Sequence, residues 1–304
     1  MAAPMVMFDR AIVMPGMSDF DERCKIIDGY NNYRQLLSLA SPAPESIADP
    51  NYSPELVRIG NDCLKEWCMR DPARFPGFIA SLPMNNPEAG MREAQRVITE
   101  LGAVGVQVYT HINGLALDQP EPMAVLEFLA EMKCPVWLHP LRSSRHADYT
   151  NETISKYDLW WALGWPHETS VCAGRLVFSG LFDRFPDLKI ITHHGGGTIP
   201  ILDGRLEYGL KALGTRYAPG DMDAAATPLK ESVISAFHRF HADTATFGSR
   251  IGVEAALSFF GPKQVYFATD FPFGEIESTM RAVDGIPANI LHSNTEILMR
   301  YCDE

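Results

Sequence analysis

The chain has 304 residues, 46% of them hydrophobic, which is enough to bury a large core as one big domain or two small ones. It carries 38 acidic and 26 basic side chains, so its formal net charge is −12, and the absence of a basic run argues against partners such as nucleic acid or an anionic membrane surface. No apolar stretch reaches membrane-spanning length, and the N-terminus lacks the basic start of a signal peptide.

The six cysteines are scattered along the chain and form no C-x-x-C pair of the kind that binds zinc. This usage is typical of reduced thiols, and we expect a cytoplasmic protein. The six are Cys24, Cys63, Cys68, Cys134, Cys172 and Cys302.

Apolar strand-like runs alternate with amphipathic segments from residue 34 onward, which predicts an α/β fold with a parallel sheet. The last element is a C-terminal helical tail. The expected helices cover about 53–70, 87–101, 120–132, 157–184, 199–213 and 249–260, with a further helix after a loop at 214–228. The expected strands lie within 34–40, 78–84, 103–110, 135–140, 188–194, 240–245 and 265–270.

Seven strands are one fewer than a closed (β/α)₈ TIM barrel contains. A doubly wound open sheet is the competing architecture, but the Gly-rich phosphate turn expected after one of its early strands is absent. We therefore predict a single barrel domain over residues 1–304, with the first strand missing or replaced. The segment available for that strand is "APMVMFDRAIVM" at residues 3–14.

Four ionisable residues fall at or near the carboxyl ends of predicted strands: His139, His194, Asp243 and Asp270. In a parallel barrel these ends open on one face, where active sites are built. A lone His or Asp at a strand end is more often a helix cap or a loop anchor, so the prediction depends on the four occurring together.

The segment "KIITHHGGG" at 189–197 holds two adjacent histidines. Counting alternate residues, we place Ile190, Thr192 and His194 on the inward face and His193 toward the helical layer. His194 would then shuttle protons, because its ordinary pKa lies near neutrality. We expect the three glycines to let substrate approach the backbone closely.

Two further strand ends suggest a metal or substrate site. "VWLHP" ends in His139, and a neutral imidazole is a common ligand of divalent transition metals. In "VYFATDFPFG", small Ala268 precedes Asp270 on the same face and leaves room for an ion or a substrate. The alternative for Asp270 is a helix N-cap.

Other polar and aromatic residues are weaker candidates. Arg142, in "HPLRSSRH", is a candidate clamp for a substrate carboxylate, with a solvated loop as the alternative. Asn113 follows a strand where a simple turn also explains it. Arg205 is a candidate buried partner or subunit contact. The three tryptophans Trp160, Trp161 and Trp165 wall the pocket or simply pack.

Together, "VWLHP", "LVFSGLFDRFPDLKIITHHGGG" and "VYFATDFPFG" resemble, in order and spacing, the amidohydrolase-related branch of the amidohydrolase superfamily, which includes aminocarboxymuconate semialdehyde and γ-resorcylate decarboxylases. The resemblance runs from about Asp21 to the C-terminus. It implies a (β/α)₈ barrel with one divalent metal, zinc or manganese. It also implies that His139 and Asp270 are metal ligands, that His194 and Asp270 are catalytic, that Arg205 binds a substrate carboxylate near a dimer interface, and that the protein is a homodimer.

The sequence departs from this family at its start. Family members open with a strand ending in His-x-His, which supplies two more metal ligands, whereas the first histidine here is His111. Either an N-terminal segment is absent from this sequence, or the protein lacks the pair and binds metal weakly or not at all. His241 and Asp243, on one strand face, are a further pair that would compensate.

Two functions remain open from the sequence. The first is a metal-dependent decarboxylase or hydrolase of a small unsaturated or aromatic carboxylic acid. The second is a metal-free barrel that serves as a binding or structural subunit, a reading that rests on the absent His-x-His pair.

Overall fold

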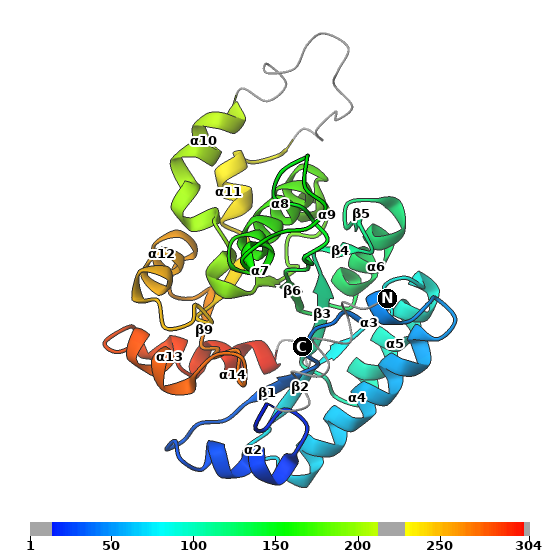
Figure 1. Ribbon diagram of the computed structural model, residues 1–304, viewed down its shortest axis with the longest axis vertical. Helices are drawn as coiled ribbons and strands as arrows, with labels where there is room; N and C mark the ends of the chain where they lie inside the picture. Colours follow the sequence, from blue (N-terminus) through cyan, green and yellow to red (C-terminus); the bar gives the residue numbers. More distant parts are fainter. Residues whose placement is uncertain (1–13, 212–228, 301–304) are drawn as a thin grey trace.

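A curved sheet of seven parallel strands lies at the centre of the computed structural model, which describes residues 14–211 and 229–300 (Figure 1). The seven strands expected from the sequence are all present, although most are shorter than their apolar runs. Their order across the sheet is β1, β2, β3, β6, β7, β8, β9. Their bounds are β1 Leu36–Ser38, β2 Gly77–Ser81, β3 Gly105–Tyr109, β6 Val136–His139, β7 Ile190–Thr192, β8 His241–Asp243 and β9 Val265–Tyr266.

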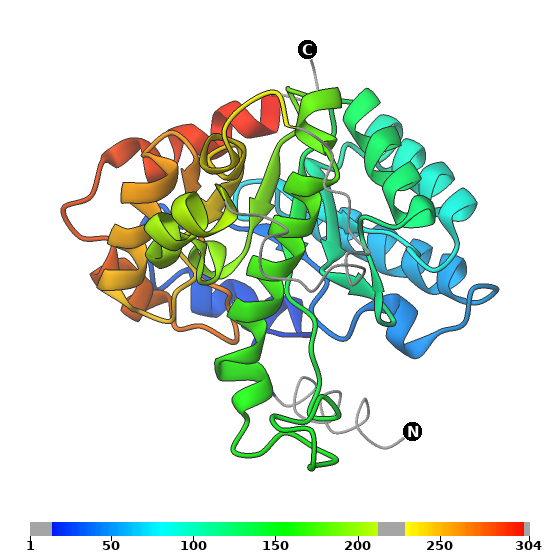
Figure 2. The ribbon, with the colours of Figure 1, turned by 90° about the horizontal axis from the view of Figure 1, so that it is seen from above.

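The helices between successive strands surround the outside of the sheet (Figure 2). The positions of most helices agree with the expected segments, but the sequence pattern missed α2 and short elements such as α3 and the β4–β5 hairpin. The longer helices are α2 Phe20–Ile27, α4 Ser53–Arg70, α5 Pro87–Thr99, α6 Pro120–Glu131, α8 Gly164–Phe178, α10 Asp203–Lys211, α12 Arg250–Phe260 and α14 Ser293–Arg300. The shorter elements are α3 Pro44–Ile47, β4 His111–Ile112, β5 Leu115–Ala116, α7 Leu159–Ala162, α9 Leu181–Arg184, α11 Val233–Phe237, α13 Ile276–Ala282, and 3₁₀ turns η1 His194–Gly196, η2 Ile199–Leu202 and η3 Ala288–Ile290.

Alternate residues of each strand belong to two separate apolar layers. Val136 and Leu138 of β6 pack outward in the large core shared with the helices. Trp137 lies between them in sequence and packs inward with Ile79, Ile191 and other side chains of a smaller inner cluster. Because the side-chain period of a strand is two, each strand end presents a defined residue to the inside of the barrel.

The sheet is open on one side. β1 and β9 are its edge strands, and within the described part of the chain no strand pairs with both of them. The segment proposed for an eighth strand lies, except for Met14, outside the described residues, as do the whole of the 214–228 loop and Cys302. The barrel class is confirmed, and the seam between β1 and β9 is the feature that shapes the site below.

Across residues 14–211 and 229–300, no helix combines the length and the apolar character that a membrane crossing requires.

Candidate active site

A cavity of about 2440 Å³ runs from the carboxyl ends of the strands along the open seam between β1 and β9. Its wall includes His139 at the end of β6, His193 just after β7, and Asp270 after β9. The strand ends therefore bring together side chains that are far apart in sequence, such as His139 and Asp270, which are 131 positions apart. This common edge is where a parallel barrel builds its active site.

Three histidine rings form a compact cluster at this edge. The ring centroid of His139 lies 5.0 Å from that of His193 and 5.5 Å from that of His194. His139 Nδ1 lies 2.7 Å from the carbonyl oxygen of Pro140, so it is the donor of that contact and Nε2 is the free acceptor nitrogen. Burial, reinforced by the two neighbouring histidines, holds the pKa of His139 well below its usual value. The ring is therefore neutral at pH 7.

Asp243, the last residue of β8, orients His193. Its Oδ2 lies 3.2 Å from His193 Nδ1, and its Oδ1 accepts hydrogen bonds from the backbone N–H groups of Gly195 and Ala245. Burial pushes the pKa of Asp243 upward, but the contact with His193 and the charges of both histidines outweigh it and keep the pKa below its ordinary value. His193 Nε2 is buried, with no hydrogen-bond partner in the described part of the chain. An oriented imidazole with one free nitrogen is suited to proton transfer.

The face assignment made from the sequence for β7 is wrong. Ile190 packs in the outer core and Ile191 in the inner cluster, so His193 continues the inward face. His194 reaches the same cluster by another route, because the strand ends at Thr192 and the chain turns there with a positive φ of 56° at His194. Its Nδ1 lies 3.0 Å from the carbonyl oxygen of Ala245.

The three glycines after His194 also have a different reason from the one expected. A Cβ on Gly196 would lie 2.6 Å from the ring of Phe260 on α12, and a Cβ on Gly197 would lie 2.5 Å from the carbonyl oxygen of Pro166 on α8. Both glycines have positive φ values, of 85° and 66°. The close approach is therefore that of two helices, and not of a substrate.

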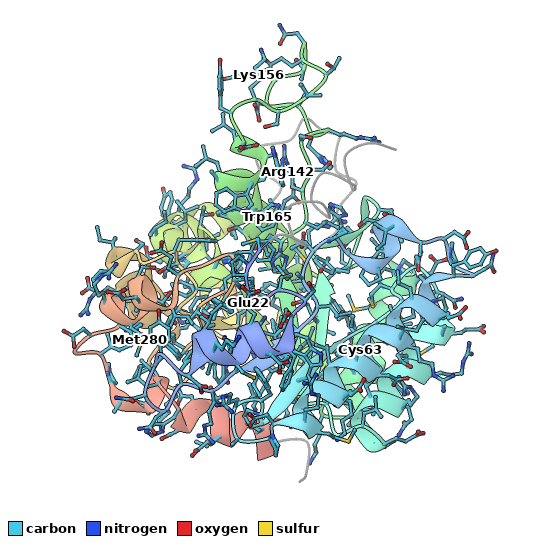
Figure 3. All side chains as sticks on the ribbon, turned by 60° about the horizontal axis from the view of Figure 1, so that its bottom comes forward. Glu22, Cys63, Arg142, Lys156, Trp165 and Met280 are labelled. Atoms are coloured by element: carbon cyan, nitrogen blue, oxygen red, sulfur yellow. The ribbon has the colours of Figure 1, made fainter. Side chains whose placement is uncertain are left out.

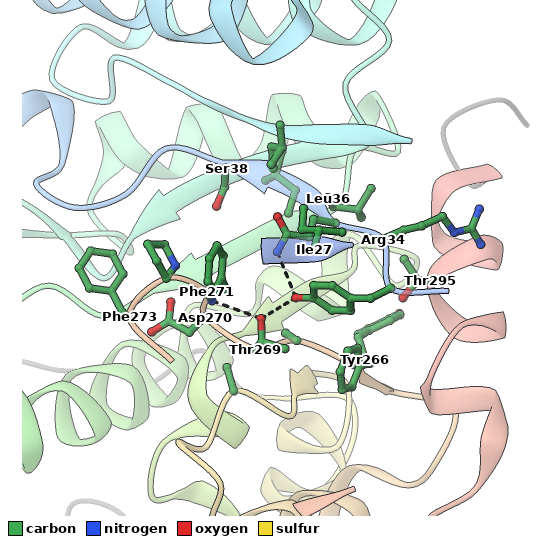
Figure 4. A pocket seen from close by; sticks show the side chains of 18 of the residues that line it. Ile27, Arg34, Leu36, Ser38, Tyr266, Thr269, Asp270, Phe271, Phe273 and Thr295 are labelled. Carbon is green, nitrogen blue, oxygen red and sulfur yellow. Dashed lines mark hydrogen bonds between the residues drawn. The ribbon is translucent and has the colours of Figure 1, made fainter. Parts of the chain in front are cut away.

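Asp270 lies in a strained turn at the seam, with a left-handed φ of 58° (Figure 4). Burial raises the pKa of its carboxyl group, although the two nearby histidines oppose that shift. Asp270 is not a helix N-cap, since the next helix, α13, begins at Ile276 and its N-cap residue is Glu275. The turn thus supplies an acid that retains its proton to higher pH than an ordinary aspartic acid.

Aromatic rings complete the wall. Trp165 stacks on His194 with centroids 6.2 Å apart, and Phe247 stacks on it at 5.7 Å. Trp161 contacts Phe247 edge-on at 5.4 Å. These rings and Trp160 line the cavity, as the sequence suggested for the tryptophans. Flat apolar surfaces of this kind suit an aromatic ligand.

None of the three side chains expected to bind substrate lines this cavity. The Nη1 atom of Arg142 lies 2.7 Å from Glu168 Oε1, so its charge is already paired, and the residue lies on the projecting segment above Trp165 (Figure 3). The Asn113 amide donates to the backbone oxygen of Glu45. Arg205 is exposed on α10.

Few side chains at this site could bind a divalent metal ion. His139 and Asp270 offer a neutral imidazole nitrogen and a carboxyl group. Within residues 14–211 and 229–300, however, no three His, Cys, Asp or Glu side chains converge in a way that could hold a metal ion. Asp243 does not extend the set to three converging side chains: its Oδ1 accepts from two backbone N–H groups, and its Oδ2 lies 3.2 Å from His193 Nδ1. A firm site takes three or four protein ligands, so the described residues alone do not fit one.

Comparison with known proteins gives a consistent family. Residues 15–285 match the family model described as Amidohydrolase. The chain is 32% identical over 274 residues to a γ-resorcylate decarboxylase of Polaromonas sp. (strain JS666), covering 84% of this chain and 78% of that protein. It is 31% identical over 259 residues to the 2-amino-3-carboxymuconate-6-semialdehyde decarboxylase of Dictyostelium discoideum, covering 81% and 67%.

Solved structures agree. The 5-carboxyvanillate decarboxylase of Sphingomonas paucimobilis superposes with a TM-score of 0.80 at 28% identity, covering 92% of this chain and 82% of that one. A dihydroxybenzoic acid decarboxylase of Polaromonas sp. JS666, with bound manganese and the inhibitor 2-nitroresorcinol, gives a TM-score of 0.78 at 27% identity, with coverages of 92% and 85%.

Proposed function

The chain belongs to the amidohydrolase family, and from that membership we propose that it is a decarboxylase of small aromatic carboxylic acids. One observation carries the proposal. A buried carboxyl group with a raised pKa, Asp270, and an imidazole oriented by Asp243, His193, line the same aromatic-walled cavity. The names of the relatives support decarboxylation as the reaction class.

Decarboxylation breaks one carbon–carbon bond. The departing carboxylate leaves as CO₂, its bonding electron pair remains on the ring carbon, and a proton from the protein takes its place. The protein must therefore supply a proton to carbon and keep water from competing for the site. The buried ring of Trp165, stacked on His194, shields one side of the cavity from water, whereas Phe247 is exposed.

We assign the proton to His193 and Asp270 together. Asp243 holds His193 Nδ1, which leaves Nε2 to receive or deliver a proton at the ring carbon, and Asp270, whose pKa burial raises, lines the same cavity as a second group for proton transfer. His194 was the catalytic histidine predicted from the sequence. In this proposal His194 forms part of the aromatic wall. Its Nε2 has no hydrogen-bond partner in the described residues, so experiment must decide whether it also transfers a proton.

We propose that a divalent metal, manganese or zinc, binds weakly, because the described residues offer only two protein ligands for it. His139 and Asp270 are the side chains we propose to contact it, and a bound cation would supply Lewis-acid polarisation of the carboxylate oxygens. Because two protein donors hold an ion weakly, we expect dialysis against a chelator to strip manganese while the chain stays folded. Elemental analysis and circular dichroism before and after dialysis check both parts.

The remaining expectations are proposals as well: residues 1–304 as one barrel domain, a cytoplasmic location, and a homodimer with Arg205 near its interface. Exposed apolar side chains within residues 149–163, on η2 and on α10 support the dimer, since unpaired apolar surface favours association. They include Tyr149, Ile154, Tyr157, Leu163, Ile201 and Tyr208.

The experiment is a substrate panel. Purified protein is incubated with 2,6-dihydroxybenzoate, isophthalate and 5-carboxyvanillate, and in parallel with aromatic esters and lactones, with and without added manganese. Release of CO₂ from an acid supports the proposal. Hydrolysis of an ester or lactone without CO₂ release assigns the hydrolase instead. Turnover of neither group by well-folded protein favours a binding subunit.

A further inference from the structure

Phe247 lies in a tight turn between β8 and α12 and is one of the residues that line the cavity. The backbone N–H of Ser249 donates to the carbonyl oxygen of Thr246 at 3.0 Å and closes the turn, and Thr246 Oγ1 donates to the carbonyl oxygen of Ser249, also at 3.0 Å. The two central residues, Phe247 and Gly248, have positive φ values of 53° and 80°. Positive φ at both central positions is typical of a type I′ turn.

Phenylalanine is an unfavourable residue for the first central position of such a turn. Asn-Gly and Asp-Gly are the usual central pairs, because Asn and Asp tolerate the left-handed region and a bulky side chain does not. The segment "TFGS" at 246–249 has the expected glycine but places a phenylalanine before it. Backbone strain of this kind concentrates at functional sites. The turn therefore indicates that the side chain of Phe247 has a use.

The ring of Phe247 belongs to the aromatic wall, and much of the residue is uncovered. Its centroid lies 5.7 Å from that of His194, with the rings stacked at 24°, and 5.4 Å from that of Trp161, with the rings edge-on at 79°. Phe247 is 45% exposed, whereas Trp165, which stacks on the same histidine, is only 9% exposed. Phe247 thus keeps aromatic surface for a ligand, while Trp165 has used its surface in packing.

The turn is packed tightly on two sides. A Cβ on Gly248 would lie 3.0 Å from Ser278 Cβ on α13, and a Cβ on Gly195, after β7, would lie 3.1 Å from Thr246 Cγ2. The backbone that carries Phe247 therefore has little room to shift. A side chain held in place before binding loses less conformational freedom when a ligand contacts it.

We propose that Phe247 is a specificity-determining residue, whose ring contacts the ring of the ligand and selects a flat aromatic acid over a saturated acid of similar size and equal charge. This inference rests on the proposed function for the ligand class and adds the side chain that recognises it. A saturated ring buries a similar apolar area, but it lacks the quadrupole that favours stacked and edge-to-face ring pairs. Phe247 therefore discriminates through the ring contact and not through buried area alone.

The test measures binding without turnover. Isothermal titration at pH 7 compares benzoate with cyclohexanecarboxylate on the full-length protein. We expect wild type to prefer benzoate by about twofold to tenfold, the range for one aromatic pair. Phe247→Leu keeps an apolar side chain without the ring and loses the preference. Phe247→Tyr keeps both the ring and the preference.

Phe247→Asn separates ligand recognition from a structural role. It creates the favoured central pair of the turn, so relief of strain offsets the lost ring contacts. We expect the unfolding temperature to stay level or rise while the preference for benzoate disappears. A ring that is only structural gives the opposite result, a lower unfolding temperature with both acids weakened equally. That result, or a preference that survives in Phe247→Leu, overturns the inference.

Tyr157→Asn is the matched control. Tyr157 is also an aromatic residue with a left-handed φ, of 57°, but it is 89% exposed and is not among the residues that line the cavity. The substitution relieves the same kind of strain and leaves the preference for benzoate unchanged. Loss of the preference in Tyr157→Asn contradicts the assignment to Phe247.

Wild-type protein that binds neither acid, or binds the two equally, also overturns the inference. If Phe247→Asn does not fold, Phe247→Leu and Phe247→Tyr decide the question by themselves. A protein that prefers benzoate through Phe247 but releases no CO₂ from any aromatic acid retains this inference and loses the proposed function. Release of CO₂ together with an unchanged preference in Phe247→Leu does the reverse.

Discussion

The cavity has two walls that are built in different ways. The histidine wall consists of His139, His193 and Asp243, which lie at the ends of three neighbouring, paired strands of the sheet. The seam wall, with Tyr33, Thr269 and Arg23, crosses the gap between β1 and β9, where backbone pairing is absent within the described strands. There Tyr33 Oη lies 2.8 Å from Thr269 Oγ1, which also accepts from the N–H of Phe271 (Figure 4). Backbone pairing fixes one wall and side-chain hydrogen bonds fix the other.

The largest effect is expected on the histidine wall. His193→Asn keeps a polar side chain of similar reach but removes the titratable ring, so kcat for CO₂ release falls by about a hundredfold to ten-thousandfold. In His194→Asn, a variant in the same cluster, kcat falls by clearly less, because the ring of His194 does not continue the inward face of β7. Steady-state assays with matched circular dichroism spectra check the pair. A larger loss in His194→Asn returns the catalytic role to the histidine predicted from the sequence.

Glu45 on α3 lies near Tyr109, whose ring contacts His139, and its ionisation tests the burial of this region. Its side chain is 3% exposed, both carboxyl oxygens lack hydrogen-bond partners in the described residues, and burial raises its pKa from 4.5 to about 7. The folded protein thus binds a proton that the unfolded chain releases, so stability falls as pH rises from about 4.5 to above 7. Glu45→Gln is expected to gain about 3 kcal/mol over wild type at pH 8, and less than about 1 kcal/mol at pH 5.

Urea unfolding of both proteins at the two pH values measures this difference. A gain that does not depend on pH would show that the effect of the substitution is not ionisation of Glu45.

Asp243→Asn sharpens the assignment of His193. The amide keeps the shape of the carboxylate but not its charge, so His193 loses the carboxylate that contacts its Nδ1 and orients the ring. We expect kcat to fall by roughly tenfold to a hundredfold with little change in KM. An unchanged kcat would mean that Asp243 serves only the backbone turn at Gly195 and Ala245.

The smallest effect belongs to the seam. Tyr33→Phe removes the hydroxyl that contacts Thr269 and accepts from Gln35, and keeps the ring. We expect a loss of about 1 kcal/mol in the free energy of unfolding, as for a typical side-chain hydrogen bond, with a few-fold fall in activity. Tyr30→Phe is the control, since its ring lies 6.1 Å from that of Tyr33 outside this network. Equal losses of stability and activity in the two variants would show that the hydrogen bond between Tyr33 and Thr269 does not stabilise the seam.

The contrast between the walls also explains what the sequence predicted. The seven strands, most helices and the positions of His139 and Asp270 follow from apolar runs that end in polar residues. The sequence placed only His194 inward, whereas both histidine rings reach the cluster; because Ile190 and Ile191 are both apolar, the alternation in β7 carries no contrast between its faces.

Long-range pairing was beyond sequence reasoning. Arg142 is paired with a residue 26 positions away, and Arg23 contacts the carbonyl oxygen of one 248 positions away. No local sequence pattern indicates either contact, because tertiary packing decides which acceptor each arginine meets.

The most direct test of the central claim is the reaction of an accepted aromatic acid in D₂O, followed by ¹H and ¹³C NMR. With an acid labelled with ¹³C in its carboxylate, we expect ¹³CO₂ and one deuterium on the ring carbon that carried the carboxylate, with His193→Asn slowing this step while the acid still binds. A product that retains its carboxylate, or an undiminished rate in His193→Asn, would contradict it.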